Sequence, residues 1–202
     1  MALATYNDLK ASVADWLHRA DLSAIIPDLI TIAEMRMNSD VVSRDMEATT
    51  TLYTVAGQKT VAMPTDVVES RRLMISSTDP KRLLDYISPE KLVQNYPYST
   101  QTMPEVYAVI GNNFELAPVP DAVYTLEYTY RQRIPSLSAS NTTNWLLTKW
   151  PNAYLYATLC ASAPYLGQDA RVQVWEQQYQ NAIQNINSVD WFTGSSMAVR
   201  SV

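Results

Sequence analysis

Cysteine, histidine and glycine are scarce in this chain. The single cysteine, Cys160, excludes an internal disulfide, and the single histidine, His18, excludes a metal site built on several histidines. Only four glycines occur, and none lies in a pattern typical of a phosphate-binding loop. No apolar run approaches the ~20 residues that a membrane-spanning helix needs. We therefore expect no metal, no cofactor and no membrane association.

Charge is also low. Charged residues make up 17% of the 202 residues, the net charge is −5, and the basic residues are scattered. Phosphate backbones are bound by clustered Lys and Arg, so a tight grip on nucleic acid is not expected. Thirteen tyrosines and five tryptophans stand against two phenylalanines. Tyrosine and tryptophan combine an aromatic ring with a hydrogen-bonding group and are enriched at protein interfaces. We therefore expect much of the surface to contact partner proteins.

The chain begins without the pattern of a signal peptide, and two helices are predicted near its start. Thr5 and Asp8 form a capping signal for the first helix. The second begins near Pro27, and its short connection to the first predicts antiparallel packing. The predicted inner face of the first helix consists of Leu9, Val13, Trp16 and Leu17.

A strand-like pattern replaces the helical one after residue 46. Segments 49–55 and 60–63 flank a turn at 56–59 and predict a β-hairpin. Further strands are predicted at 67–75 and 82–87, since both segments are rich in strand-forming residues.

A short helix is predicted to begin at Ser88, which is followed by proline and glutamate. A second hairpin is predicted from segments 106–110 and 114–116. Alternation of tyrosine and leucine with polar residues from Tyr124 to Tyr130 predicts a strand with one half-buried face.

The chain returns to helical periodicity at Trp145. From there to Ala161 it is apolar on all sides, which predicts a helix at the centre of a core. A last helix is predicted after residue 168, with an apolar stripe formed by Val172, Trp175, Tyr179, Ala182, Ile183, Ile186 and Val189. The rest of its surface is rich in amides, and four of these are candidate contacts between subunits: Gln173, Gln177, Gln180 and Gln184.

These elements predict an α+β fold, in which N- and C-terminal helices form a bundle around a central antiparallel β insertion. The expected parts are a helical pair at 1–45, a β-rich insertion at 46–135, C-terminal helices at 136–192 and an extended tail at 193–202. A tail without a core of its own is either frayed or docked on another protein. The candidate partner contacts at this end of the chain are Trp191, Phe192, Met197, Val199, Arg200 and Val202.

No catalytic residue is predicted. Cys160 lies in the most apolar helix and is interpreted as a small buried hydrophobe. The pairs Asp66 with Glu69 and Glu115 with Asp121 could serve acid–base chemistry only in a cleft, which a sequence does not reveal. The alternative hypothesis is a small carbohydrate-binding or glycoside-cleaving module that uses surface aromatics and such a pair.

Several short segments spread over most of the chain resemble the head-to-tail adaptor proteins of tailed bacteriophages, a family related to tail tubular protein A of short-tailed phages. The segments are Thr5–Leu9, Asp15–Leu22, Ile26–Ile30, Ala33–Asn38, Gly111–Pro118, Leu126–Tyr130, Ala163–Leu166 and Val174–Tyr179. None carries a catalytic signature.

The resemblance implies a virion structural protein at the head–tail junction, without enzymatic activity and assembled in the bacterial host cytoplasm. Such proteins form a homo-oligomeric ring, commonly of twelve copies, beneath the portal protein. Their helical part and C-terminal segment dock on the portal, and their β part faces the tail nozzle or tail tube protein. Double-stranded DNA passes through the lumen, without sequence-specific binding.

Overall fold

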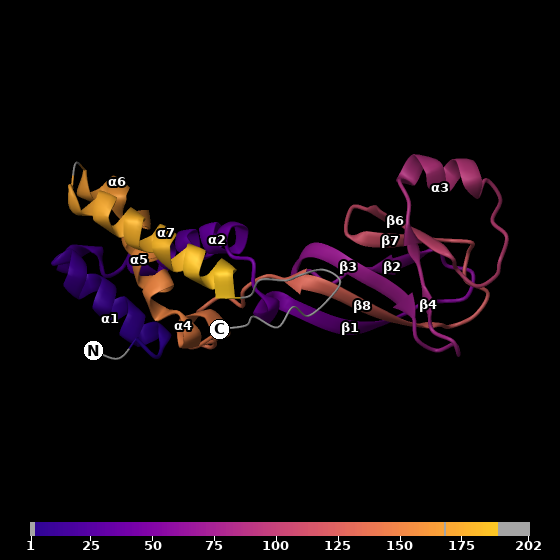
Figure 1. The fold of residues 1–202 in the computed structure, drawn as a ribbon, viewed down its shortest axis with the longest axis horizontal. Coiled ribbons are helices and arrows are strands. Elements are labelled where there is room, and N and C mark those ends of the chain that lie inside the picture. The colour runs from indigo at the N-terminus through magenta and orange to yellow at the C-terminus, as the bar shows by residue number, and fades with distance from the viewer. Residues whose placement is uncertain (1–2, 168, 190–202) are drawn as a thin grey trace, which may run out of the picture. The chain divides into compact units, whose positions relative to one another are not determined.

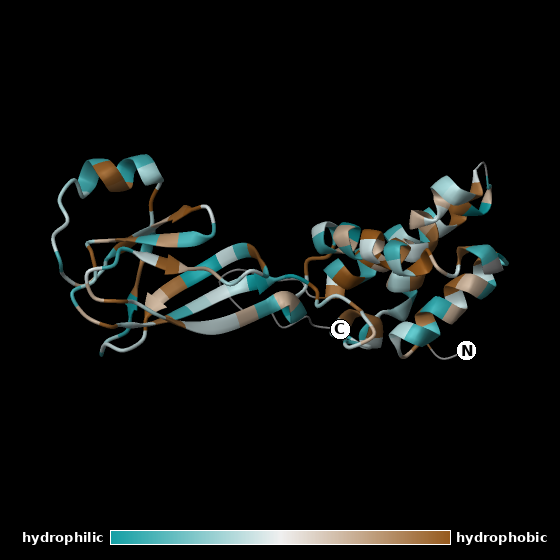
Figure 2. Cartoon of the chain, turned by 180° about the vertical axis from the view of Figure 1, so that it is seen from behind, coloured by the Kyte–Doolittle hydropathy of each residue, from teal (hydrophilic) through white to brown (hydrophobic). Residues whose placement is uncertain are grey.

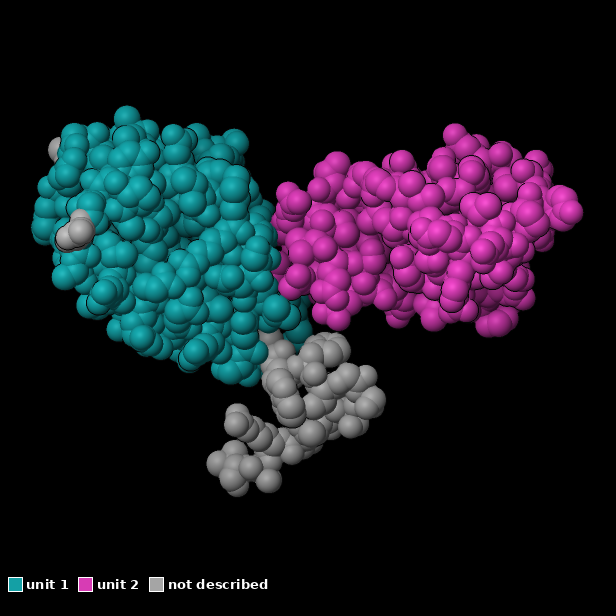
Figure 3. Space-filling model, turned by 90° about the horizontal axis from the view of Figure 1, so that it is seen from above, with its two compact units in different colours: residues 1–45, 134–202 teal, residues 46–133 magenta. Residues whose placement is uncertain are grey.

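The structure is a computed structural model that describes residues 3–167 and 169–189. It has the predicted α+β class, with helices at both ends of the chain and strands between them (Figure 1). The chain divides into two compact units, which Figure 3 colours separately. Unit 1 is formed by the residues up to 45 together with those from 134 onward, and unit 2 is formed by residues 46–133.

Unit 1 is helical. Its helices are α1 (Tyr6–Leu17), α2 (Ile26–Asp40), α4 (Trp145–Lys149), α5 (Pro151–Ala161), α6 (Ala163–Leu166) and α7 (Arg171–Val189), with a 3-10 turn, η1, at Ala20–Leu22. A second 3-10 turn, η2 (Arg44–Met46), precedes the first strand.

The predicted cap of α1 is confirmed. Thr5 Oγ1 accepts a hydrogen bond from the amide of Asp8 at 3.2 Å, and the Asp8 carboxylate accepts one from the amide of Thr5 at 3.0 Å. The predicted inner face is wrong at Trp16, which is 43% exposed and lies edge-on to Tyr156. The other three residues of that face, Leu9, Val13 and Leu17, are buried.

α5 is the central helix of unit 1, as its all-round apolar surface predicts. It packs against α1, α2 and α7 (Figure 1). The predicted single helix from 145 to 161 is nevertheless two helices, because α4 ends at Lys149 and α5 begins at Pro151, with Trp150 between them. Proline has no N–H to donate and its ring clashes with the preceding turn, so Pro151 starts a new helix instead of continuing α4.

A buried polar network joins α2 to the segment that re-enters unit 1 after residue 133. Glu34 is only 3% exposed, and its Oε1 accepts hydrogen bonds from the Leu137 amide at 2.8 Å and the Tyr154 hydroxyl at 3.1 Å. Asn144 donates to the same hydroxyl at 2.6 Å and caps α4 through the Leu147 amide. Burial raises the pKa of Glu34 and that of Tyr154.

Unit 2 contains two four-stranded sheets, ordered β1-β8-β3-β4 and β2-β7-β6-β5. All neighbouring strands are antiparallel except β5 and β6. The elements are β1 (Glu47–Tyr53), β2 (Thr60–Ala62), β3 (Val67–Ile75), β4 (Arg82–Leu83), β5 (Asp85–Tyr86), α3 (Pro89–Asn95), β6 (Val106–Ile110), β7 (Asn113–Ala117) and β8 (Thr125–Gln132).

One of the two predicted hairpins is wrong. β1 pairs with β8 and β2 pairs with β7, so the segment between them carries the chain from one sheet to the other. The Gly57 amide donates to the Pro120 carbonyl, which ties this segment to a distant part of the chain. The other hairpin, β6–β7, is confirmed, and Gly111 between its strands has a positive φ of 61°.

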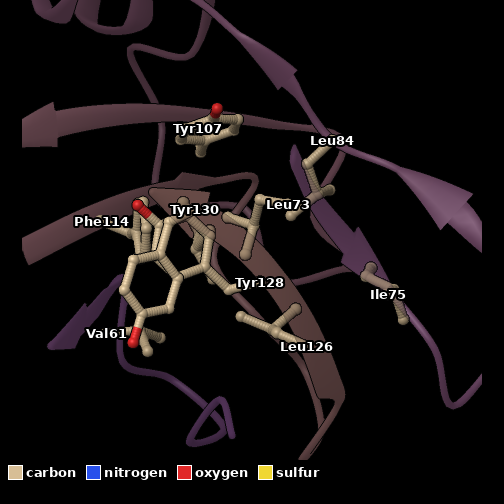
Figure 4. Packing of buried hydrophobic residues seen from close by; sticks show 10 residues of the cluster. Val61, Leu73, Ile75, Leu84, Tyr107, Phe114, Leu126, Tyr128 and Tyr130 are labelled. Carbon is tan, nitrogen blue, oxygen red and sulfur yellow. The ribbon is translucent and has the colours of Figure 1, made fainter. Parts of the chain in front are cut away.

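Aromatic rings fill the core of unit 2 (Figure 4). Tyr107 lies edge-on to Phe114, Phe114 lies edge-on to Tyr128 at 4.8 Å between ring centroids, and Tyr128 stacks on Tyr130. The Tyr128 hydroxyl is hydrogen-bonded to the Ser70 hydroxyl at 2.7 Å. The predicted tyrosine face of β8 is therefore buried, and it faces residues of both sheets. Along the ribbon of each unit, hydrophilic and hydrophobic residues are interleaved (Figure 2).

The burial of Glu34 leads to an expected pH dependence of stability. Because burial raises the pKa of Glu34 in the folded state, its ionisation costs stability as the pH rises from about 4 towards 7. Glu34→Gln keeps an acceptor oxygen and does not ionise, so its free energy of unfolding relative to wild type should increase over that pH range. Glu34→Leu should instead lose about 2 kcal/mol, since it leaves a buried N–H and hydroxyl without their acceptor.

Urea unfolding followed by circular dichroism at a series of pH values measures both effects. Glu105→Gln is a matched control at an exposed glutamate. Parallel pH profiles for wild type and Glu34→Gln would contradict the assigned role of burial.

Candidate interaction surface

The outer face of α7 carries a stripe of amides. Gln173, Gln177, Gln180 and Gln184 follow one another at spacings of four, three and four, which places them on one side of the helix, and all four are exposed. The opposite side is buried through Trp175, Tyr179, Ala182, Ile183 and Ile186. Val189 departs from the expected apolar stripe, because it ends the helix and is 66% exposed.

We call these four glutamines the amide stripe. The helix around them is uncharged from Gln177 onward. No charged residue occurs in the sequence from Gln177 to Val189. The Gln177 amide donates to Asn181 at 3.3 Å, and the Gln180 amide donates to Glu176 at 2.9 Å. Each glutamine carries two N–H donors and an acceptor oxygen, so most of this hydrogen-bonding capacity remains available to a partner.

An ion pair holds α7 against α2. The Arg36 guanidinium donates to both carboxylate oxygens of Glu176, at 2.8 and 2.5 Å, and lies 4.2 Å from the centroid of the Tyr179 ring. The Tyr179 hydroxyl donates to Asp40 at 2.7 Å. These hydrogen bonds from Arg36 lower the pKa of Glu176 to about 2. The bidentate geometry fixes which side of α7 faces outward.

A second contact holds the other end of α7. The Asn187 amide donates to the Asp40 carbonyl at 3.0 Å, and its oxygen accepts from the Val42 amide at 2.9 Å. Asn187 therefore satisfies backbone groups where α2 ends. The sequence pattern does not reveal this role, because Asn187 belongs to the same amide-rich series as the exposed residues.

Cys160 and His18, the single cysteine and the single histidine, lie in different surroundings. Cys160 is partly buried, and burial together with the Glu176 carboxylate raises the pKa of its thiol to about 12, which keeps it protonated at neutral pH. His18 is exposed and ends α1 with a positive φ of 52°. It lines a hollow of about 420 Å³ together with Asp15, Trp16, Arg171 and Trp175.

The four carboxylates considered for acid–base chemistry are each bound by other side chains. The partners are Tyr130 and Gln132 for Asp66, Arg71 and Arg131 for Glu69, Lys59 for Glu115, and Tyr124 for Asp121. None of these carboxylates lines the hollow at His18. Their contacts explain them as surface and strand-pairing groups.

Two further findings concern the described residues only. In residues 3–167 and 169–189, no group of three or more His, Cys, Asp or Glu is placed to hold a metal ion. No helix within the same ranges combines the length and apolarity needed to cross a membrane.

The predicted contacts of the C-terminal tail lie outside the described residues. These are Trp191, Phe192, Met197, Val199, Arg200 and Val202. Their role stays a prediction, as does the contact between subunits assigned to the amide stripe.

The ion pair between Arg36 and Glu176 is expected to stabilise the fold in a pH-dependent way. Because the pKa of Glu176 is about 2 in the folded protein and about 4.3 when unfolded, the ion pair stabilises the fold above the unfolded pKa. This contribution is lost as the pH falls towards 2. A double-mutant cycle of Arg36→Met and Glu176→Gln should give a coupling energy of about 1 kcal/mol at neutral pH, a value reduced for partial exposure.

Chemical denaturation of the four proteins between neutral and acid pH measures the coupling. Arg19→Met is the matched control, because Arg19 forms a similar bidentate pair with Asp21 at the surface. A coupling energy that does not fall with pH would refute the assigned ion pair.

A family model described as the SU10 adaptor protein matches residues 4–200, which is nearly the whole chain. A search of curated proteins finds no match. The family match supports the resemblance to phage head-to-tail adaptors, and with it a structural role in the virion. The chain belongs to the SU10 adaptor protein family.

Proposed function

We propose that this protein forms a homo-oligomeric ring that joins the portal to the tail and surrounds the DNA channel. The observation that carries the proposal is the amide stripe of α7, an exposed and uncharged surface on a helix held firmly to the bundle. Family membership supplies the adaptor role, and the stripe supplies a surface suited to contact between copies. A ring of twelve copies is what the resemblance implies, and the relation to tail tubular protein A stays a prediction.

An uncharged surface suits repeated contact between identical acidic chains. Each copy has a net charge of −5, so charges accumulate as copies gather. Amides form hydrogen bonds across an interface without adding to this repulsion. A ring also needs two different complementary faces on each copy, and the stripe would provide one of them.

The acidic balance suits the passage of DNA. A net negative ring repels the phosphate backbone, so DNA moves through the lumen without being held. Sequence-specific binding is not required for this role. No enzymatic activity is part of the proposal.

Native mass spectrometry tests the proposal. The purified protein is measured alone and mixed with the portal ring of the same phage. A complex whose mass corresponds to the portal ring plus a fixed number of copies of the chain supports the proposed ring. A chain that stays unbound in the presence of this portal ring would refute it.

The C-terminal tail gives a prediction of its own. Deleting residues 194–202 should abolish portal binding, because the apolar side chains of the tail are the proposed portal contacts. The thermal unfolding temperature should stay the same, because the sequence of the tail predicts no core of its own. Co-purification with the portal measures the loss, and a variant with the same nine residues in scrambled order is the control. Undiminished binding of the deletion variant would remove the tail from the interface.

The amide stripe gives a second prediction. Gln177→Lys with Gln184→Lys places two positive charges on the amide stripe of every copy. Burying such charges at an interface should weaken assembly about tenfold or more, as seen in the protein concentration at half-assembly. Gln94→Lys in α3 is the control, since Gln94 is also an exposed helical glutamine. Equal effects of the two variants would rule out a specific role for the stripe.

A further inference from the structure

Among the described residues, one sheet edge of unit 2 lacks the features that protect an edge strand from pairing with another chain. β1 lies at the edge of its sheet and pairs with β8 over all seven residues without a register shift. No strand formed by the described residues pairs with its other side. From Ala48 to Tyr53, β1 contains no proline, no charged residue and no bulge, which are the usual devices that keep an edge from pairing with another chain. β1 is seven residues long, whereas the other edge strands of the two sheets, β2, β4 and β5, are three, two and two residues long, so a partner strand at β4 would pair directly with only part of β1.

The opposite edge of the same sheet is β4, and its direction is complementary. The neighbouring strands β1, β8, β3 and β4 are antiparallel at every step, so β1 and β4 run in opposite directions. If a second copy stands in the same orientation, its β4 therefore meets β1 of the first copy in an antiparallel sense. With an odd number of alternating strands, the two edge strands of neighbouring copies would run parallel instead. Four strands allow the alternation to continue from copy to copy.

The register across the sheet indicates which residues would meet. Thr51 is opposite Glu127, Glu127 is opposite Met74, and Met74 is opposite Leu83. Extending this row without an offset places Leu83 of the next copy beside Thr51. The adjacent row, from Leu52 to Arg82, continues in the same way.

The side chains at the two edges suit this pairing. Leu83 is 60% exposed and Tyr53 is 63% exposed, so two large apolar groups would leave water. The residues from Thr49 to Tyr53 are uncharged, so Lys81 and Arg82 of the next copy would meet no like charge.

We propose that β1 of one copy pairs with β4 of the next, so that this sheet continues around the adaptor ring. The inference rests on the proposed ring and names a surface by which its copies meet. The occupant of the β1 edge is thus a second copy of this chain. Backbone hydrogen bonds supply the contact, and the four-strand alternation fixes its direction.

Disulfide trapping tests this pairing. Thr51→Cys and Leu83→Cys are combined in a Cys160→Ala background, and rings are assembled on the portal and oxidised. Directly opposed residues of antiparallel strands have Cα atoms about 4.5–5.5 Å apart, which lies within the range of about 4.4–6.8 Å that a disulfide spans. We expect reducible covalent multiples of the chain up to the closed ring. Each single cysteine variant should remain monomeric on a denaturing gel.

Thr51→Cys with Thr60→Cys is the matched control, because Thr60 is an exposed threonine on β2, at the edge of the other sheet. Circular dichroism first establishes that each variant keeps the fold of the Cys160→Ala protein. Rings that form, by native mass spectrometry, without the Thr51–Leu83 crosslink would overturn the strand pairing and leave the proposed function standing. Equal crosslinking of the control pair would have the same consequence. Absence of any ring on the portal would overturn the proposed function and, with it, this inference.

Discussion

The buried carboxylate of Glu34 is the constraint on which the helical unit depends. Unit 1 is interrupted by 88 residues of unit 2, so its two parts meet only through tertiary contacts. Glu34 supplies such a contact from α2, because it binds the Leu137 amide of the returning segment and the Tyr154 hydroxyl of the central helix. Asn38, one turn further along α2, accepts from the Ile134 amide at the point of return. A buried polar group is tolerated only when it is hydrogen-bonded, so these contacts favour one path of the chain over others.

These contacts also fix the position of α7 in unit 1. The returning segment positions α5, and α5 packs against both α2 and α7. Arg36 and Asn187 then fasten α7 to α2 near its middle and near its end. With both contacts made, the helix cannot rotate about its axis without breaking a charge-assisted pair. The outward direction of the amide stripe is thus a consequence of the bundle and not of α7 alone.

Local and periodic signals could be predicted from the sequence, and distant pairings could not. The Thr5 cap and the tyrosine face of β8 depend on neighbours in sequence, and both are present. The partner of β1 is β8, about 80 residues away, and a nearby turn signal wrongly favoured β2. Pro151 did carry a readable signal, since proline ends or starts a helix, but the apolar run around it hid the break. At the candidate surface, periodicity placed the four glutamines outward, whereas it could not tell Asn187 from them, because its partners lie 145 and 147 residues away.

The two proposed contacts between copies differ in what they demand of the sequence. Pairing of β1 with β4 would use backbone groups, so it depends on strand number and direction more than on side chains. The amide stripe would depend on side-chain identity, because a charged side chain there would be buried without a partner at every contact between copies. Substitutions on β1 that keep the strand would then be tolerated, whereas loss of one strand from its sheet would reverse the direction of the edge. In such a ring, the even number of strands in the sheet would set the direction in which copies pair, and the face of α7 would determine which surface each copy recognises.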